Sequence, residues 1–298
     1  MNKTGIKNWW LAIRPKTLTA AIIPIAAATA LAHRHGVAQF GIAFCALGSA
    51  LAIQIATNLI NDFIDFDKGA DTEERLGPVR VTQSGLFTRG QVKAAAATAI
   101  SLAVLFGAPV VVVGGWPLLT VGVISLFMAY AYTGGPWPLA YLGLGDIFVI
   151  VFFGLVSVCG VYFLEAQTLN RDAVVLGFQI GLLAAVLIAI NNLRDVAQDV
   201  KAHKKTLAVR FGVAFVRREI MMLIVVAFAL QLYWASNYGW VVGLAPLFML
   251  PLAIKIVRQI ARTEPSRAYN QFLAQSAALH AGFGLILSLA FLVGNAAK

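Results

Sequence analysis

The sequence predicts an all-α, polytopic membrane protein. Of its 298 residues, 60% are hydrophobic and only 12% are charged, and its mean hydropathy of +0.81 lies well above the values of soluble domains. The apolar residues fall in runs of about 17 to 25, the length at which an α-helix crosses the hydrocarbon core, whereas barrel strands alternate over about ten residues. We therefore expect a bundle of transmembrane helices that forms a single domain over residues 1–298.

Division of the chain at its polar segments predicts nine helices. Helices at 17–34 and 39–62 lead into a long polar segment, 63–91. Four more follow with short connections, and a second long polar segment, 196–215, comes after them: 92–113, 117–132, 139–163 and 173–195. Helices at 216–236 and 239–257 precede a shorter polar segment, and the last helix is expected at 270–294. The boundaries are the points where apolar runs meet charged residues, Gly or Pro.

The distribution of positive charge predicts the orientation in the membrane. The basic N-terminal lead-in and the three polar segments carry nearly all of the 23 Lys and Arg, which leaves only Arg34, Arg171 and Lys298 for the other side. By the positive-inside rule, the N-terminus and the polar loops face the cytoplasm, and the C-terminus lies outside. Topology and contact with membrane lipid then explain the net charge of +10, and no nucleic acid partner is expected.

Most of the 13 carboxylates gather in two clusters on the predicted cytoplasmic side. The stretch "NDFIDFDKGAD" at 61–71 holds four aspartates, and Asp195 and Asp199 begin the second long segment. Such acids are often solvated loop charges. However, Asn61 lies four residues before Asp65, as Asp195 does before Asp199, so each pair shares one helical face. We expect the two faces to converge on one mouth.

Oxygen ligands without His or Cys favour Mg²⁺, which uses few carboxylates and completes its octahedron with water and phosphate oxygens. Lys68 and Gly69 predict a helix end with a left-handed glycine, after which Asp71 turns back. Four residues are the candidate catalytic ligands, namely Asp65, Asp71, Asp195 and Asp199. Asn61 and Asp62 are expected to help them. The cations for a diphosphate are expected among Arg75, Arg80, Lys201, Lys204, Lys205 and Arg210.

Four further residues are candidates for binding an acceptor or supporting the acidic clusters. Asp146 is an ionisable residue at the membrane face, which indicates function, although it could instead cap a helix N-terminus. The ring of Tyr132 could stabilise a carbocation or anchor the chain at the interface. Asn192 and Arg194 lie beside Asp195, where they could serve a substrate or make structural hydrogen bonds.

Four stretches resemble the UbiA superfamily of intramembrane aromatic prenyltransferases: "RPKTLTAAIIP" at 14–24, "NDFIDFDKGAD" at 61–71, "YTGGPWPLAYLGLGD" at 132–146 and "NNLRDVAQDVKAHKKTLAVRFG" at 191–212. Members are nine-helix bundles with aspartate-rich motifs at the cytoplasmic ends of the second and sixth helices. In the family the first motif often places Asp four and eight residues after Asn, whereas here the eighth position is Gly69 and the carboxylate follows at Asp71. This form resembles the branch that prenylates 1,4-dihydroxy-2-naphthoate in menaquinone synthesis.

The resemblance implies a Mg²⁺-dependent enzyme. It would transfer a polyprenyl group from polyprenyl diphosphate to 1,4-dihydroxy-2-naphthoate with loss of CO₂ and diphosphate, which gives demethylmenaquinol. Another acceptor, such as 4-hydroxybenzoate, or a chlorophyll- or haem-directed activity remains an alternative. A secondary transporter is a further alternative, although transporters place their ionisable residues near the middle of the bilayer on broken helices, and here the acids gather at one face.

Overall fold

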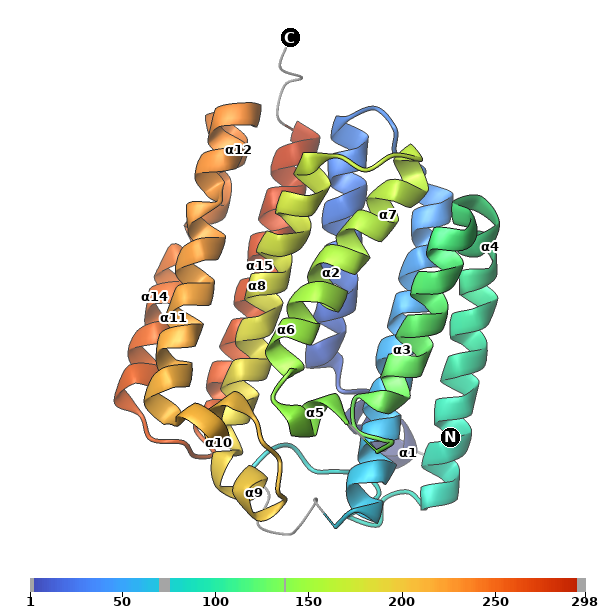
Figure 1. Ribbon diagram of the computed structural model, residues 1–298, viewed down its shortest axis with the longest axis vertical. Coiled ribbons are helices and arrows are strands. Elements are labelled where there is room, and N and C mark those ends of the chain that lie inside the picture. Colours follow the sequence, from blue (N-terminus) through green and yellow to red (C-terminus); the bar gives the residue numbers. More distant parts are fainter. Residues whose placement is uncertain (1–2, 70–75, 137, 294–298) are drawn as a thin grey trace.

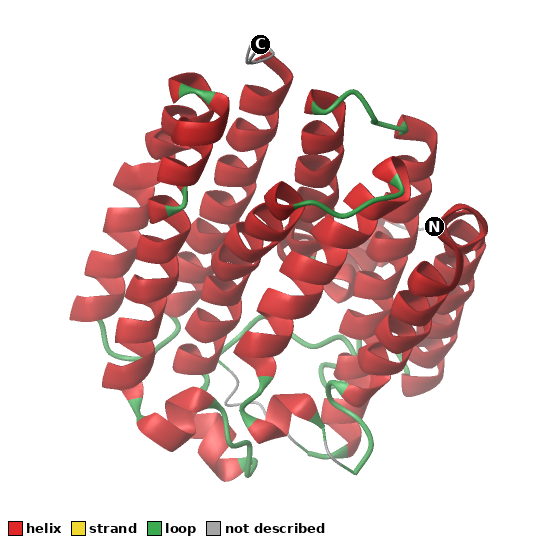
Figure 2. Cartoon of the chain, turned by 45° about the horizontal axis from the view of Figure 1, so that its top comes forward, coloured by secondary structure: helices red, strands yellow, loops and turns green. Residues whose placement is uncertain are grey.

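The computed structural model describes residues 3–69, 76–136 and 138–293, and every regular element within these ranges is helical, as predicted (Figures 1 and 2). The chain begins with α1 (Lys3–Ile13), α2 (Pro15–Arg34) and α3 (Phe40–Asp67). Pro15 occupies the first turn of α2, where its missing N–H costs nothing. The predicted left-handed glycine is confirmed, because Gly69 has φ +66° directly after α3 and its cap residue. Since α3 extends beyond residue 62, Asp65 lies on the helix itself.

Helix α4 (Arg89–Ala131) is bent back on itself. It starts at a capping box formed by Thr88 and Gln91. Gly115, with φ 62° and ψ −152°, leaves the helical region inside it, and the two halves lie side by side (Figures 1 and 2). These halves correspond to the predicted helices 92–113 and 117–132.

The predicted helix 139–163 is wrong at its start. The structure has two short helices there, α5 (Leu139–Leu142) and α6 (Gly145–Val149), followed by a π-helix, η1 (Ile150–Val156), and by α7 (Ser157–Ala166). The break lies at Gly143, whose φ is +73° and where a Cβ would lie 2.5 Å from the carbonyl oxygen of Lys205. Only glycine fits both the backbone conformation and this close approach.

The second half of the chain begins with the long helix α8 (Arg171–Arg194), which Asn170 caps through the backbone N–H of Ala173. The remaining elements are α9 (Val196–Lys201), α10 (Leu207–Phe211), α11 (Val213–Ala229), α12 (Gln231–Tyr238), α13 (Trp240–Leu244), the 3₁₀ helix η2 (Ala245–Met249), α14 (Leu250–Arg262) and α15 (Tyr269–Val293).

The π-helix η1 touches α8 backbone to backbone. A Cβ on Gly154 would lie 2.4 Å from the carbonyl oxygen of Gly177 and 2.6 Å from the Cα of Gly181. A Cβ on Gly181 would in turn lie 2.6 Å from the carbonyl oxygen of Ile150. Small residues allow this approach in membrane helices, where close van der Waals contact replaces the hydrophobic effect between helices.

Seven helical segments within the described ranges are long and apolar enough to cross a membrane. On α4, the side chains of Leu105 and Val112 are 67% and 83% exposed, which suits contact with lipid tails. The chain is therefore a multi-pass membrane protein. The count of nine stays a prediction, because α4 counts once among the seven although it bends at Gly115, and α11 and α12 are separate helices that meet at Leu230.

The core lies along α2, α8 and α15, whose residues Leu31, Ile180 and Phe283 are fully buried. The short helices α5, α9 and α10 gather at one end of the bundle, together with α1 and the end of α3 (bottom of Figure 1). We call this the mouth end. Helix α15 finishes at the opposite end (top of Figure 1).

Candidate active site

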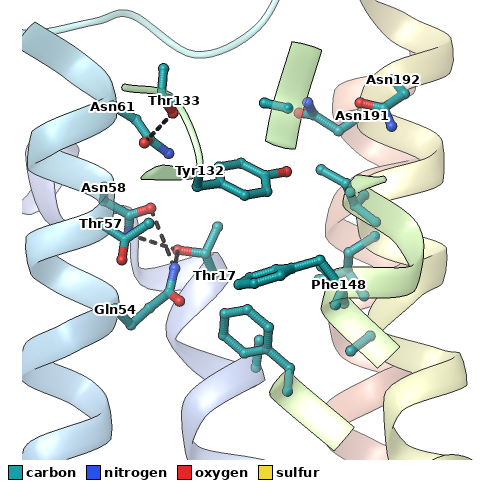
Figure 3. Close-up of a pocket in the computed structure, with 18 of the residues that line it drawn as sticks. Thr17, Gln54, Thr57, Asn58, Asn61, Tyr132, Thr133, Phe148, Asn191 and Asn192 are labelled. Carbon is teal, nitrogen blue, oxygen red and sulfur yellow. Dashed lines mark hydrogen bonds between the residues drawn. The ribbon is translucent and has the colours of Figure 1, made fainter. Parts of the chain in front are cut away.

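A chamber of about 360 Å³ lies between the helices and reaches the mouth end (Figure 3). Its walls come from α2, α3, the end of α4, α6 with η1, α8 and α15. The structure brings nine of the residues predicted from the sequence into this lining: Asn61, Asp65, Arg80, Tyr132, Asp146, Asn192, Asp195, Asp199 and Lys204. Both acidic clusters therefore face one cavity, although they are far apart in the sequence.

Asp65 is the charged centre of the first cluster. Its side chain is buried, and Arg80 donates to its Oδ2 at 2.9 Å. The Lys204 ammonium lies 3.7 Å from its Oδ1, which has no hydrogen bond within the described part of the chain. One turn earlier on α3, Asn61 accepts a hydrogen bond from the hydroxyl of Thr133 (Figure 3).

Asp62 lies elsewhere than predicted, outside the chamber lining. Its two oxygens accept hydrogen bonds from the backbone N–H groups of Val81 at 3.2 Å and Thr82 at 3.0 Å, and Arg14 lies 3.9 Å away. Because it follows Asn61 by one residue, it points to another side of α3. Asp62 thus anchors the segment that carries Arg80.

The second cluster lies where α8 gives way to α9. Arg194 is 1% exposed and donates two hydrogen bonds to the carboxylate of Asp195, at 2.8 and 2.6 Å. The same guanidinium donates to Asn191 and to Asn270 of α15. Arg194 therefore holds the carboxylate of Asp195 in place, which favours structural hydrogen bonding over substrate binding as the role of this arginine. Asn192 lines the chamber beside them.

Asp199 follows on α9, where the backbone N–H of Asp199 donates to the carbonyl oxygen of Asp195 at 2.8 Å. Burial raises the pKa of Asp199 to about 7, with smaller increases from the charges of Asp195 and Asp65, while the Lys204 ammonium acts in the opposite direction. Lys204 thus lies within electrostatic reach of both clusters and links them across the mouth.

Three of the other predicted cations do not reach the chamber. Lys201, Lys205 and Arg210 are exposed and lie outside its lining, and Arg210 donates from Nε to the carbonyl oxygen of Lys205. Asp71 and Arg75 lie outside the described residues, so their predicted roles stay predictions.

One wall of the chamber is aromatic. The rings of Tyr132 and Phe148 lie 5.8 Å apart, and Phe148 stacks on Phe152 at 4.3 Å (Figure 3). Burial, and then the charges of Asp146, Asp65 and Asp199, raise the pKa of Tyr132, so its phenol stays protonated. Nothing in the sequence distinguishes Phe148 and Phe152 from the many other apolar residues of this span.

The facing wall is polar. Asn58 donates to the hydroxyl of Thr17 at 2.9 Å, and Gln54 lies next to both of them (Figure 3). These residues were not predicted as site residues either, although the sequence contains a signal for Gln54 and Asn58 on α3. Gln54, Asn58, Asn61 and Asp65 follow one another at steps of four, three and four residues, which places them on one face of α3 in an otherwise apolar run.

Asp146 lies in the first turn of α6 and is 3% exposed. The N-cap of that helix is Leu144, without a side-chain hydrogen bond, so the alternative of a capping aspartate is wrong. Neither carboxylate oxygen of Asp146 has a hydrogen bond within the described part of the chain. A buried acceptor without a donor is rare and indicates a role in binding or catalysis.

The donor set suits Mg²⁺. The residues that face the mouth offer only oxygen ligands, from Asn61, Asp65, Asp195 and Asp199, and the buried Oδ1 of Asp65 makes no hydrogen bond within the described ranges. Within the same ranges no three His, Cys, Asp or Glu side chains meet to form a complete metal site. Mg²⁺ commonly needs only one or two carboxylates when phosphate oxygens and water supply the rest.

Comparison with known proteins identifies the family of the chain. Residues 21–279 match the model of the UbiA prenyltransferase family. A 1,4-dihydroxy-2-naphthoate octaprenyltransferase of Haemophilus influenzae is 34% identical over 300 residues, with 97% of each chain covered. The protein of that name from Escherichia coli is 37% identical over 265 residues, with 85% of each chain covered.

Among solved structures, a UbiA homolog from Archaeoglobus fulgidus bound to GPP and Mg²⁺ has a TM-score of 0.69 at 15% identity, over 96% of this chain and 99% of that one. At this identity the likeness concerns the fold alone. Because the family match spans most of the sequence and the relatives above 30% identity cover nearly all of it, the chain belongs to the UbiA prenyltransferase family.

Proposed function

We propose that this protein transfers a polyprenyl group from polyprenyl diphosphate to 1,4-dihydroxy-2-naphthoate, with loss of CO₂ and diphosphate, in menaquinone synthesis. The observation that carries the proposal is the meeting of Asp65 and Asp199, from two distant segments, on one chamber with an aromatic wall. The named activity of relatives that are 34% and 37% identical supports the choice of acceptor.

The donor diphosphate would bind at the mouth. Asn61 and Asp65 on α3, with Asp71, and Asp195 and Asp199 after α8 are the residues that would hold Mg²⁺ around it. When bound, Mg²⁺ would neutralise the charge that develops on the departing diphosphate. Arg80 and Lys204 already lie against Asp65, so their positive charges are in place to bind phosphate oxygens.

The isoprenoid chain would extend from the mouth into the chamber and the surrounding lipid. The ring of Tyr132, whose phenol stays protonated, and the ring of Phe148 line the same chamber as the acidic clusters, and the face of an aromatic ring stabilises an allylic cation. The apolar part of the lining would limit the access of water, which would protect such a cation from hydrolysis.

The acceptor would lie between the aromatic wall and the polar wall. Its ring carbon that carries the carboxylate forms the new bond to the terminal carbon of the allylic cation. The bond from that carbon to the carboxylate then breaks, CO₂ leaves, and its electron pair restores the aromatic ring. Asp146 and Asn192 are the residues we assign to orienting the acceptor hydroxyls, because both line the chamber and Asp146 has buried oxygens ready to accept a hydrogen bond.

We further propose that the mouth end faces the cytoplasm of a bacterial inner membrane. The basic residues of the N-terminal lead-in and of the loops around α9 and α10 lie at this end, and the positive-inside rule assigns such an end to the cytoplasm. Soluble dihydroxynaphthoate could then reach the mouth directly, while the donor enters from the lipid.

The test is to incubate the purified protein with Mg²⁺, a radiolabelled polyprenyl diphosphate and one aromatic acid at a time. Prenylated, decarboxylated product from 1,4-dihydroxy-2-naphthoate is expected. Product from 4-hydroxybenzoate alone would contradict the acceptor, and a secondary transporter would give no product with any acid. Activity that survives the double substitution Asp65→Asn and Asp195→Asn would contradict the role of the two clusters.

A further inference from the structure

Tyr141, on the short helix α5, lies between two lysines that come from different parts of the chain. The Lys68 ammonium, just after α3, lies 4.7 Å from the centre of its ring. The Lys204 ammonium, just after α9, lies 5.1 Å from the same centre. Both distances are within the range of a cation–π interaction. One ring therefore holds a cation from each half of the mouth.

Backbone hydrogen bonds fix the place of this ring. The backbone N–H of Lys205 donates to the carbonyl oxygen of Tyr141 at 3.0 Å. The backbone N–H of Ala140 donates to the carbonyl oxygen of Tyr132 at 2.9 Å. The Lys68 ammonium also donates to the carbonyl oxygen of Thr133 at 2.7 Å. Thr133 and Tyr141 thus connect the end of α3 with the loop between α9 and α10, which gives a place to Tyr141 of the stretch "YTGGPWPLAYLGLGD".

The arrangement concentrates positive charge beside Asp65. Lys204 lies 3.7 Å from this carboxylate and Arg80 lies 2.9 Å from it. Burial lowers the pKa of Lys68. The negative charge of Asp65 raises this pKa, and the positive charge of Lys204 lowers it further. Two ammonium groups that share one ring repel each other, and an anion with several charges that binds both of them relieves the repulsion.

We propose that Lys68 binds the diphosphate together with Lys204, and that Tyr141 is a positioning residue that holds these two lysines at the mouth. That the anion is the diphosphate of a prenyl donor rests on the proposed function. Tyr141 itself touches no reacting atom. Its contribution is to keep two flexible side chains in the binding geometry, which lowers the entropy that is lost when the anion binds.

Two substitutions at Tyr141 test the role of the ring. The dissociation constant of inorganic diphosphate, with Mg²⁺ present, is measured for the full-length protein in detergent. Tyr141→Leu removes the ring and is expected to weaken binding about three- to tenfold, which corresponds to the loss of about 0.65 to 1.4 kcal/mol of cation–π interaction. Tyr141→Phe keeps the ring and is expected to restore the affinity to within about twofold.

A double-substitution cycle tests whether Tyr141 acts through the lysines. Lys68→Gln alone is expected to weaken diphosphate binding, and Tyr141→Leu should cost less in the Lys68→Gln background than in the wild type. The KM for the donor should rise in Tyr141→Leu, while the KM for the acceptor stays unchanged. A merely structural role would instead change both KM values and the melting temperature, which is followed as a check on folding.

The results separate this inference from the proposed function. An unchanged diphosphate affinity in Tyr141→Leu, or fully additive effects of the two substitutions, would overturn the role of Tyr141. Unchanged affinity in Lys68→Gln would overturn the role of Lys68. If the wild type binds diphosphate as expected but prenylates no aromatic acid, the proposed function is contradicted, whereas the assignment of the anion site to Lys68 and Lys204 is retained.

Discussion

Arg80 and Asp65 form a buried ion pair, with 2.9 Å between guanidinium nitrogen and carboxylate oxygen and with side chains that are only 7% and 6% exposed. The pair joins the segment before α4 to the end of α3. It is held in place from the other side of the helix by Asp62, which binds the backbone N–H groups of Val81 and Thr82. Asp65, the central acid of the first cluster, is therefore held in place by the segment between α3 and α4.

Asp65→Asn should abolish most of the activity. The change removes a negative ligand and leaves Arg80 buried opposite a neutral amide, so kcat/KM is expected to fall about 100-fold or more. The matched control is Asp67→Asn on the same helix, because Asp67 is partly exposed, pairs with Arg89 and lies outside the chamber lining. Steady-state kinetics at saturating Mg²⁺ measure both variants. Equal losses in the two would mean that the position of Asp65 in the chamber has no special importance.

Arg194→Gln should lower the stability of the fold. The substitution removes the hydrogen bonds of a fully buried guanidinium to Asp195, Asn191 and Asn270. The loss of one partner of a buried ion pair costs about 3 to 5 kcal/mol. Arg194→Lys is expected to recover only part of the lost stability, because lysine lacks the planar guanidinium that donates to several acceptors at once. Thermal unfolding in detergent checks both, with the exposed Arg218→Gln as the control that should leave the melting temperature unchanged.

Gly154→Ala should disturb the acceptor side of the chamber. The added methyl would meet backbone atoms of α8 at 2.4 and 2.6 Å, and overpacking of this kind costs about 1 to 3 kcal/mol. Because Phe152 lies on the same π-helix as Gly154 and stacks on Phe148 of α6, we expect a higher KM for the acceptor as well as a lower melting temperature. Gly122→Ala on α4 is the control, since no atom lies within 4 Å of its added Cβ. A normal acceptor KM in Gly154→Ala would contradict the link between this contact and the aromatic wall.

The end of the bundle opposite the mouth should lose stability in acid. Both ring nitrogens of His35 are hydrogen-bonded: Nδ1 lies 2.7 Å from the hydroxyl oxygen of Tyr162, and Nε2 lies 2.6 Å from the hydroxyl oxygen of Tyr238. Tyr238 in turn donates to Asp172 at 2.5 Å, so its oxygen accepts from Nε2–H, and Tyr162 donates to an unprotonated Nδ1. The network therefore requires the neutral ring.

Burial lowers the pKa of His35, Asp172 opposes the change and Arg34 adds to it. The folded state thus takes up its proton at lower pH than the unfolded chain. The stability that depends on neutral His35 is present above its unfolded pKa of about 6.5 and is lost as the pH falls through the folded value. Melting temperatures between pH 7.5 and 5 should decline less steeply in His35→Gln than in the exposed control His33→Gln. Equal slopes would contradict this assignment.

The sequence predicted the fold class, both acidic clusters and their meeting at one mouth, because long apolar runs and four-residue spacings are local signals. It placed Asp62 wrongly, since which side of α3 faces the chamber depends on tertiary packing. The break at Gly143 and the π-helix were missed, because they result from contacts with Lys205 and with α8. Phe148 and Phe152 were missed for a related reason, since an aromatic side chain in an apolar span carries no mark of the cavity it lines. Tyr141 was missed because its contacts with Lys68 and Lys204 form only in the folded chain.

The most direct test of the central claim follows the carboxylate of the acceptor. The purified protein is supplied with Mg²⁺, polyprenyl diphosphate and 1,4-dihydroxy-2-naphthoate labelled in its carboxyl group, and released CO₂ and prenylated product are counted together. We predict one labelled CO₂ for each prenyl group transferred, with both lost in Asp65→Asn. Product that retains the carboxyl label, or transfer that proceeds at the wild-type rate in Asp65→Asn, would contradict the account.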